Sequence, residues 1–357
     1  MLHALILAGG SGTRFWPLSR RSRPKQCLKL FSGTTLVAET RARLRGLVAD
    51  DRVWVVAPGR LKPDLEKELP GVAPARFVLE PEGRNTGPAI ALALAAVEAS
   101  DPGATLAVLP ADHVIRPAGA LRDALGAAAL EAERSGRIVL FGIRPGSPAT
   151  GYGYIRPGPG AGPARPVESF VEKPDLERAK RFVADGGYLW NAGIFVATAR
   201  RFIEAIEAAA PDLARPLALV RARLKGGSAT SDAEIAALYA SMPEVPFDRA
   251  VVERFADVAV IEAPFQWDDV GDFRAVERHV AADGRGNVSR GSALFVGAAR
   301  CTVVAPDLPA LVVAADVEDI LVVATADAIL VTRKGDGERL RGIVEAVRRA
   351  GRADLLE

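Results

Sequence analysis

Short, uninterrupted apolar segments alternate with longer segments of helical composition in the first part of the chain. The apolar segments are residues 5–8, 53–57, 105–109 and 138–143, and helical composition marks residues 88–97 and 121–134. Apolar strands without alternation are typical of sheets covered on both faces. Strands that alternate with helices indicate βαβ units. The sequence therefore predicts an α/β fold, with a Rossmann-like, mostly parallel sheet flanked by helices.

The composition changes near residues 283–287, where Asp-Gly-Arg-Gly-Asn is typical of a turn. Beyond this turn, Gly, Pro and Asp separate short β-like segments, and Leu340, Ile343, Val344 and Val347 then follow helical spacing. Such an apolar stripe predicts a helix docked on the chain's own core. We therefore expect one domain at residues 1–282 and a small β-rich domain at 283–357 that ends in a helix. The Gly- and Pro-rich residues 151–166 are expected to form a loop. The β-like segments are residues 293–296, 301–304, 311–313, 320–324 and 329–332.

Composition excludes several classes of protein. The chain has 357 residues, a net charge of +2, two cysteines and three histidines. Two cysteines exclude a disulfide scaffold, and so few histidines argue against a zinc hydrolase. The near-balanced charge does not predict a nucleic-acid partner. No uninterrupted apolar run reaches the roughly 18 residues of a membrane span, and the start lacks a signal-peptide pattern, so we expect a cytoplasmic protein that does not bind a membrane.

A glycine-rich turn follows the first apolar segment directly, as Leu7-Ala8-Gly9-Gly10-Ser11-Gly12-Thr13-Arg14. Successive backbone N–H groups in such a turn can bind phosphate. The spacing matches neither the Walker loop nor the dinucleotide fingerprint, which disfavours a dehydrogenase. Six Arg and Lys residues lie between positions 14 and 29, and no Asp or Glu occurs before Glu39. This pattern favours a triphosphate ligand over a solvated basic loop.

Residues 7–20 and the segment Arg23-Pro24-Lys25-Gln26 resemble the opening of sugar-1-phosphate nucleotidyltransferases. Within this family, the mannose-1-phosphate guanylyltransferase branch resembles these segments most. The resemblance implies that Arg14 binds the triphosphate and that Lys25 binds the phosphates at the reacting centre. It also implies that the nucleotide is approached by Leu7, Gly9, Gly10, Gly12 and Thr13.

The segment Glu80-Pro81-Glu82-Gly83-Arg84-Asn85-Thr86 precedes a helical stretch. Taken alone, Asn85 or Thr86 is an N-cap of that helix. The resemblance instead places the segment over the nucleotide base, which makes Glu80, Asn85 and Thr86 nucleotide-binding residues. Hydrogen-bond chemistry allows Glu80 to accept from the N1–H and N2–H groups of guanine.

Two acidic positions are candidates for a magnesium site. Asp112 follows an apolar segment, where ligand sites of α/β folds lie. Mg²⁺ prefers one or two carboxylates together with substrate phosphates. A second carboxylate is expected from Asp268, Asp269 or Asp272, among which the residues alone do not choose. The resemblance selects Asp269, so Asp112 and Asp269 are the expected Mg²⁺ ligands.

Several segments resemble the sugar side of this family. In Phe170-Val171-Glu172-Lys173-Pro174, Lys173 would bind the sugar 1-phosphate and Glu172 would accept from hydroxyl groups. Taken alone, a Glu-Lys pair is a surface pair. Tyr152 and Trp190 either stack on the sugar or pack in the core. The resemblance assigns further sugar contacts to Gly151, Asn191 and Gly193 and, in a segment where Val252 and Arg254 replace the usual Met and Lys, to Asp248.

These resemblances imply an enzyme that converts GTP and mannose 1-phosphate into GDP-mannose and pyrophosphate with Mg²⁺. The sugar phosphate is itself an anionic nucleophile, so no nucleophilic side chain is needed. The chain resembles the short bacterial type without an isomerase domain, and exposed β-edges suggest a homodimer. The alternatives are another pair of sugar 1-phosphate and nucleotide, or a non-catalytic regulator that binds GDP-mannose.

Overall fold

The computed structural model describes all residues of the chain except 11, 230–231 and 336. The chain forms two compact units that do not follow sequence order. Unit 1 contains residues 1–9, 41–111 and 115–267, and unit 2 contains residues 10–40, 112–114 and 268–357. The division predicted after residue 282 is a different one and stays a prediction. Within the described part of the chain, no helix combines the length and apolar character needed to cross a bilayer.

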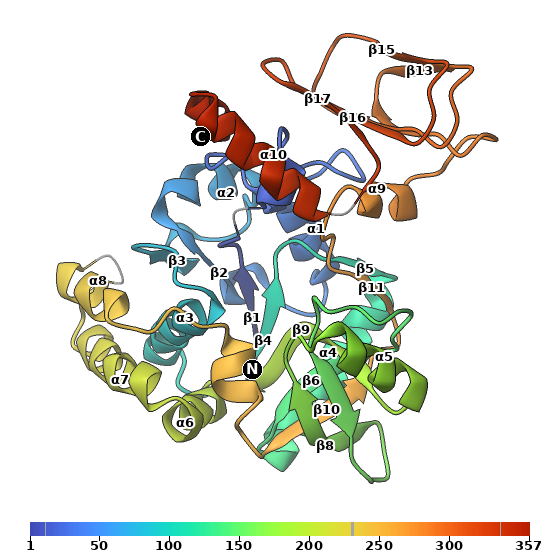
Figure 1. Cartoon of the computed structure of the whole chain (residues 1–357). Coiled ribbons are helices and arrows are strands. Elements are labelled where there is room, and N and C mark those ends of the chain that lie inside the picture. Colours follow the sequence, from blue (N-terminus) through green and yellow to red (C-terminus); the bar gives the residue numbers. More distant parts are fainter. Residues whose placement is uncertain (11, 230–231, 336) are drawn as a thin grey trace. The chain divides into compact units, whose positions relative to one another are not determined.

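Unit 1 is built on a nine-stranded mixed sheet (Figure 1). The strands predicted at residues 5–8, 53–57, 105–109 and 138–143 are confirmed, and so is the α/β class. The sheet is more mixed than predicted, because β9 runs antiparallel to both of its neighbours, β4 and β6. The predicted loop at 151–166 is wrong in part, since it contains β7 and the start of β8. In sheet order the strands are β3 (Phe77–Glu80), β2 (Val53–Pro58), β1 (Leu2–Leu7), β4 (Thr105–Pro110), β9 (Leu189–Thr198), β6 (Ile138–Ile143), β10 (Val258–Glu262), β8 (Ala164–Val171) and β7 (Tyr154–Pro157).

The helices of unit 1 bury this sheet. Helix α3 (Thr86–Ser100) is apolar around most of its circumference and almost wholly buried, because α6 and α7 pack against the side that does not face the strands. Helix α4 (Ala118–Ser135) ends at Gly136, whose left-handed backbone closes the last turn. The remaining helices are α2 (Lys62–Glu68), α5 (Leu176–Asp185), α6 (Ala199–Ala209), α7 (Pro211–Lys225) and α8 (Ala233–Ala240).

Unit 2 joins the glycine-turn segment to the C-terminal part of the chain in one core. Phe15 and Leu28 are buried in the same cluster as Val270, Val323 and Val344. The basic segment is therefore not a solvated loop. Its apolar residues are held in place by the last third of the chain.

The C-terminal segment winds into stacked coils of short strands (Figure 1). Strands β12 (Val288–Gly291), β14 (Thr302–Ala305) and β16 (Ile320–Ala324) pair in parallel, and β17 (Ile329–Arg333) pairs antiparallel with β16. Strand β13 (Ala293–Val296) pairs in parallel with β15 (Val312–Ala315). Helix α9 (Arg274–His279) precedes the coils and α10 (Gly337–Arg349) follows them. The predicted β segments and final helix are confirmed, and Leu340 and Val344 of α10 lie in the unit's own core.

The chain passes between the two units five times, and three of these crossings lie within short elements. They are α1 (Leu36–Arg43), β5 (Val114–Arg116) and β11 (Gln266–Asp268).

Candidate active site

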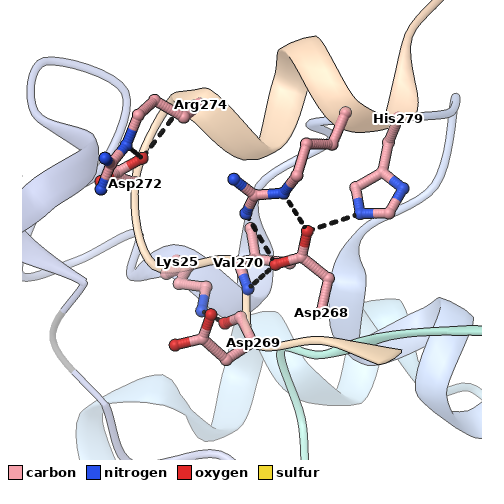
Figure 2. Close-up of polar contacts among 8 residues, drawn as sticks. Lys25, Asp268, Asp269, Val270, Asp272, Arg274 and His279 are labelled. Carbon is pink, nitrogen blue, oxygen red and sulfur yellow. Dashed lines mark hydrogen bonds and ion pairs between the residues drawn. The ribbon is translucent and has the colours of Figure 1, made fainter. Parts of the chain in front are cut away.

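Lys25 is the centre of a charged cluster in unit 2. It lies in the short turn η2 (Lys25–Cys27) and is only 8% exposed. Its Nζ atom lies 2.8 Å from Oδ2 of Asp112. The same atom donates a hydrogen bond of 2.6 Å to the backbone carbonyl of Asp269 (Figure 2). One ammonium group thus contacts both segments from which the sequence predicts Mg²⁺ ligands.

The charge of Asp112 depends on this contact. Burial by itself would raise the pKa of the Asp112 carboxyl group, but the positive charges of Lys25 and His113 and the hydrogen bond from Lys25 outweigh it. The net result is a pKa below the ordinary value, so Asp112 is held as a carboxylate. A carboxylate is the form that binds a hard cation or orients an ammonium group.

The acids at the end of β11 and in the loop that follows have different hydrogen-bond partners (Figure 2). Asp268 accepts hydrogen bonds from Arg278, His279 and the backbone N–H of Val270. Burial opposes the ionised form of Asp268, but these donors outweigh it and hold its pKa far below the ordinary range.

Asp272 is also engaged within the loop, because it accepts hydrogen bonds from both the guanidinium group and the backbone N–H of Arg274. Asp268 and Asp272 therefore serve the architecture of the loop. The choice of Asp269 among the three acids, which the residues alone could not make, stays a prediction.

Two glycines lie beside the charged side chains, and one of them makes room for Lys25. Gly12 has a positive φ of 62°, and a Cβ atom at this position would collide with the Cβ and backbone N of Lys25. At Gly271, a Cβ atom would lie 3.5 Å from both Nη1 of Arg14 and Oδ2 of Asp269. These are ordinary contact distances, so Arg14 and Asp269 both lie beside position 271 without needing a glycine there.

The other arginines of the basic segment have structural partners. Arg20 pairs with Asp327, Arg21 with Glu357 and Arg23 with Asp307. The lack of nearby acids in the sequence was therefore misleading, since the acids come from the C-terminal coils and tail. Arg14, by contrast, forms no ion pair with any residue that the structure describes.

In unit 1, Glu80 ends β3 and is buried. Its Oε1 atom accepts a 2.6 Å hydrogen bond from the Tyr239 hydroxyl group, and its Oε2 atom would lie 2.9 Å from a Cβ atom built on Gly9. Tyr239 was not among the predicted site residues, because it lies in a helix of ordinary composition. Nothing in the sequence marks it as a partner of Glu80.

The side chains of Asn85 and Thr86 accept hydrogen bonds from backbone N–H groups of the protein itself. Asn85 caps α3 with its side-chain oxygen, at a positive φ of 71°, and the Thr86 hydroxyl group accepts from the backbone N–H of Phe247. The capping role that these residue types predict on their own is confirmed. A nucleotide-binding role stays a prediction.

A second polar cluster in unit 1 gathers the predicted sugar residues. Nδ2 of Asn191 donates to Oδ1 of Asp248 at 2.5 Å, and Oδ1 of Asn191 accepts from the backbone N–H of Gly193. Lys173 pairs with Glu172 at 3.0 Å. Burial and the negative charge of Glu172 raise the pKa of Asp248 to about 6. Asp248 begins η6 (Asp248–Val252), a turn of π-helix, a feature frequent at functional sites.

Two residues of this cluster were not predicted. A Cβ atom on Gly153 would lie 2.6 Å from Oε2 of Glu172, whereas one on the predicted Gly151 would meet nothing within 4 Å. Glu253 accepts from the backbone N–H of Glu172. The side chain of Glu172 thus lies close to Gly153, while the sugar contact expected at Gly151 stays a prediction.

The remaining predicted residues lie at the glycine turn. The carbonyl of Leu7 accepts from the backbone N–H of Ala111, a Cβ atom on Gly10 would meet nothing within 4 Å, and Thr13 is exposed at the start of η1 (Thr13–Phe15). Leu7 and Gly9 belong to unit 1, and Gly10, Gly12 and Thr13 to unit 2. The turn is therefore the point at which the chain first enters unit 2.

The family model described as nucleotidyl transferase matches residues 3–284. The chain belongs to the nucleotidyl transferase family. It is 41% identical over 297 residues to the xanthan biosynthesis protein XanB of Xanthomonas campestris pv. campestris, a match that covers 81% of this chain and 62% of that protein. It is 36% identical over 310 residues to a mannose-1-phosphate guanylyltransferase of Escherichia coli, covering 85% and 65%. This family member thus spans less than two thirds of the length of these curated relatives.

A solved structure extends the likeness over almost the whole chain. It is described as mannose-1-phosphate geranyltransferase from Thermus thermophilus, with a TM-score of 0.86 and 35% identity. The match covers 97% of this chain and 99% of that chain. The C-terminal coils therefore lie within the region of likeness and are not confined to this chain.

The carboxylates near Lys25 limit which kind of metal ion could bind there. Over the described residues, no group of three or more His, Cys, Asp and Glu side chains is placed to hold one. A structural zinc or calcium site needs more protein ligands than Asp112 and Asp269 supply. Two carboxylates do fit Mg²⁺, which takes its other ligands from water and substrate phosphates.

Proposed function

We propose that this chain transfers GMP from GTP to mannose 1-phosphate and releases GDP-mannose and pyrophosphate. The observation that carries the proposal is the double contact of Lys25 with Asp112 and Asp269. It brings a cation and two acidic segments together beside Arg14, and transfer to an anionic acceptor needs such charges rather than a nucleophilic side chain. The names of the guanylyltransferase relatives support the choice of base and sugar.

The transfer forms one bond to phosphorus and breaks another. A 1-phosphate oxygen of the sugar attacks the α-phosphorus, and the bond from that phosphorus to the β-phosphate bridging oxygen breaks with its electron pair. Pyrophosphate leaves, and no proton has to move between heavy atoms. Catalysis is then a matter of positioning and of balancing negative charge.

Each charged residue has one part in this scheme. Lys25 stabilises charge that develops on the α-phosphate, and Arg14 holds the β- and γ-phosphates that leave. Lys173 orients the incoming sugar phosphate, while Asn191, Asp248 and Glu172 bind sugar hydroxyl groups. Asp112 and Asp269 hold Mg²⁺, which when bound offsets phosphate charge. Glu80 accepts from the base. A cytoplasmic location and a homodimer remain predictions.

The test is pyrophosphate release with Mg²⁺, in which GTP, ATP, UTP and dTTP are each combined with mannose 1-phosphate and glucose 1-phosphate. We expect release with GTP and mannose 1-phosphate at least about tenfold faster than with any other pair, which corresponds to roughly 1.4 kcal/mol of discrimination. A different preferred pair would replace our assignment of base and sugar. Tight GDP-mannose binding without release from any pair would indicate a non-catalytic regulator.

A further inference from the structure

Glu80 and Tyr239 form a buried pair in unit 1. Glu80 is 4% exposed at the end of β3, and Tyr239 of α8 is fully buried. The Tyr239 hydroxyl group lies 2.6 Å from Oε1 of Glu80. The other carboxylate oxygen, Oε2, faces Gly9 just after the end of β1, where the missing side chain leaves room beside the oxygen at the glycine turn.

The protonation state of a carboxyl group decides which purine it can bind. Guanine presents two donors on one edge, N1–H and N2–H, whereas adenine presents an acceptor at N1 and a donor at N6. An ionised carboxylate has only acceptors and therefore pairs with guanine. A neutral carboxyl group has one donor and one acceptor, which is the pattern that pairs with adenine.

Two opposing influences act on Glu80. Burial raises its pKa, and the Tyr239 hydrogen bond and the positive charge of Arg60 lower it by less, so the pKa of Glu80 lies above its ordinary value. Tyr239 itself remains a donor, because burial and the charge of Glu80 raise the pKa of its hydroxyl group. Near Tyr239, Arg84 and Glu82 act in opposite directions on that pKa. Among the described side chains, Tyr239 is therefore the hydrogen-bond donor that favours the ionised form of Glu80.

We propose that Tyr239 is a positioning residue for base selection: its hydroxyl group keeps Glu80 oriented and acceptor-only, so that the chain prefers guanine to adenine. The inference rests on the proposed function, in which Glu80 contacts the base. Tyr239 does not touch the nucleotide in this scheme and acts only through Glu80.

The test measures equilibrium binding of GDP, IDP and ADP, and steady-state turnover of GTP and ATP, between pH 5.5 and 8.5. In Tyr239→Phe we expect GDP binding to weaken by about 10- to 100-fold, the usual loss for a hydrogen bond to a charged group. The KM for GTP should rise while kcat stays within about twofold, since the lost contact acts on binding of the base and not on the reacting phosphates. The acid limb of kcat/KM for GTP should move to higher pH, because the lost donor no longer favours ionised Glu80.

Two further variants keep the test decisive. Ile235→Val removes a buried methyl group from the same helix and should leave the base preference and the acid limb unchanged. Glu80→Gln carries one donor and one acceptor, so it should bind ADP at least as tightly as GDP. Adding Tyr239→Phe to Glu80→Gln should not change the base preference further, because the group that Tyr239 controls is gone.

The outcomes separate the inference from the proposed function. A guanine-specific wild-type protein whose Tyr239→Phe variant keeps the same GDP-to-ADP ratio and the same acid limb overturns the inference alone. A Glu80→Gln protein that still prefers GDP also overturns it. A wild-type protein that binds ADP as tightly as GDP overturns the guanine assignment in the proposed function, and this inference with it.

Discussion

The Nζ atom of Lys25 lies 2.8 Å from Oδ2 of Asp112, and the same atom donates to the carbonyl of Asp269. The lysine side chain is 10% exposed and that of Asp112 is 26% exposed, so water screens this ion pair only in part. The pair joins two segments of unit 2 that are far apart in sequence. Lys25 therefore has a structural contact and, in the proposed reaction, a role on the α-phosphate.

Lys25→Met should lower turnover by about 100- to 1,000-fold, because a positioned charge on the phosphates is removed. Pyrophosphate release at saturating substrates measures this loss. Lys67→Met is the control, since its ammonium group is exposed and pairs with Asp64 in the adjacent turn. Turnover of the Lys25 variant close to that of the control would contradict the assignment.

Asp269→Asn and Asp268→Asn should fail in different ways. Asp269→Asn should lose most of its turnover, because a proposed Mg²⁺ ligand is weakened. Asp268→Asn should be destabilised by about 1–3 kcal/mol, because Arg278 and His279 lose their charged acceptor. Thermal denaturation and pyrophosphate release are measured on both. A stable, active Asp269→Asn protein would remove Asp269 from the metal site.

Gly12→Ala should destabilise the protein by about 1–3 kcal/mol and lower turnover. Alanine is strained at a φ of 62°, and its methyl group would collide with Lys25. Gly10→Ala is the matched control for stability, because a Cβ atom there meets nothing within 4 Å. Equal melting temperatures for the two variants would show that the turn tolerates a side chain at position 12.

Arg14→Ala and Arg23→Ala test which cations serve the substrate. Arg14→Ala should raise the KM for GTP by about tenfold or more, as expected for loss of a charge-assisted phosphate contact. Arg23→Ala removes an exposed pair with Asp307, worth about 0–1 kcal/mol, and should leave the KM unchanged. Initial rates at varied GTP distinguish the two. A larger effect at position 23 would reverse our assignment.

Asp248→Asn should stabilise the protein at pH 8 while it weakens sugar-phosphate binding. The pKa of Asp248 is about 6 in the folded chain, against an ordinary value of 3.8 that applies to the unfolded chain. The folded state therefore holds more protons between these values, and stability falls as the pH rises from about 4 to 6 and stays lower above it. The asparagine side chain does not ionise, so the variant does not lose this part of the free energy of unfolding, which is at most about 3 kcal/mol.

Chemical denaturation at pH 4.5 and pH 8 checks the Asp248 prediction. The difference between the variant and the wild-type protein should be larger at pH 8. A difference that is equal at both pH values would mean that Asp248 ionises normally in the folded protein. The KM for mannose 1-phosphate, measured at pH 8, reports the functional part separately.

Local patterns predicted much of the fold. The apolar runs that become β1, β2, β4 and β6 are continuous because both faces of the sheet are covered, and that property is visible in a single segment. Strand β9 was not foreseen as an antiparallel strand between β4 and β6, because strand order depends on pairing between distant segments. The β7–β8 hairpin was not predicted, because its Gly and Pro residues indicated a loop. These residue types also occur at strand ends and in tight turns.

For the site, the sequence by itself determined the residue types and their order: a glycine turn, a basic segment, acids after apolar runs, and a resemblance that named Arg14, Lys25, Asp112 and Asp269. The partners of the charged groups are visible only in the folded chain, where Arg20 and Arg23 pair with the C-terminal coils and Tyr239 donates to Glu80. The physical reason is that hydrogen bonds and ion pairs act over a few ångströms in space. Glu80 and Tyr239 are 159 residues apart in sequence, so no local pattern records their contact.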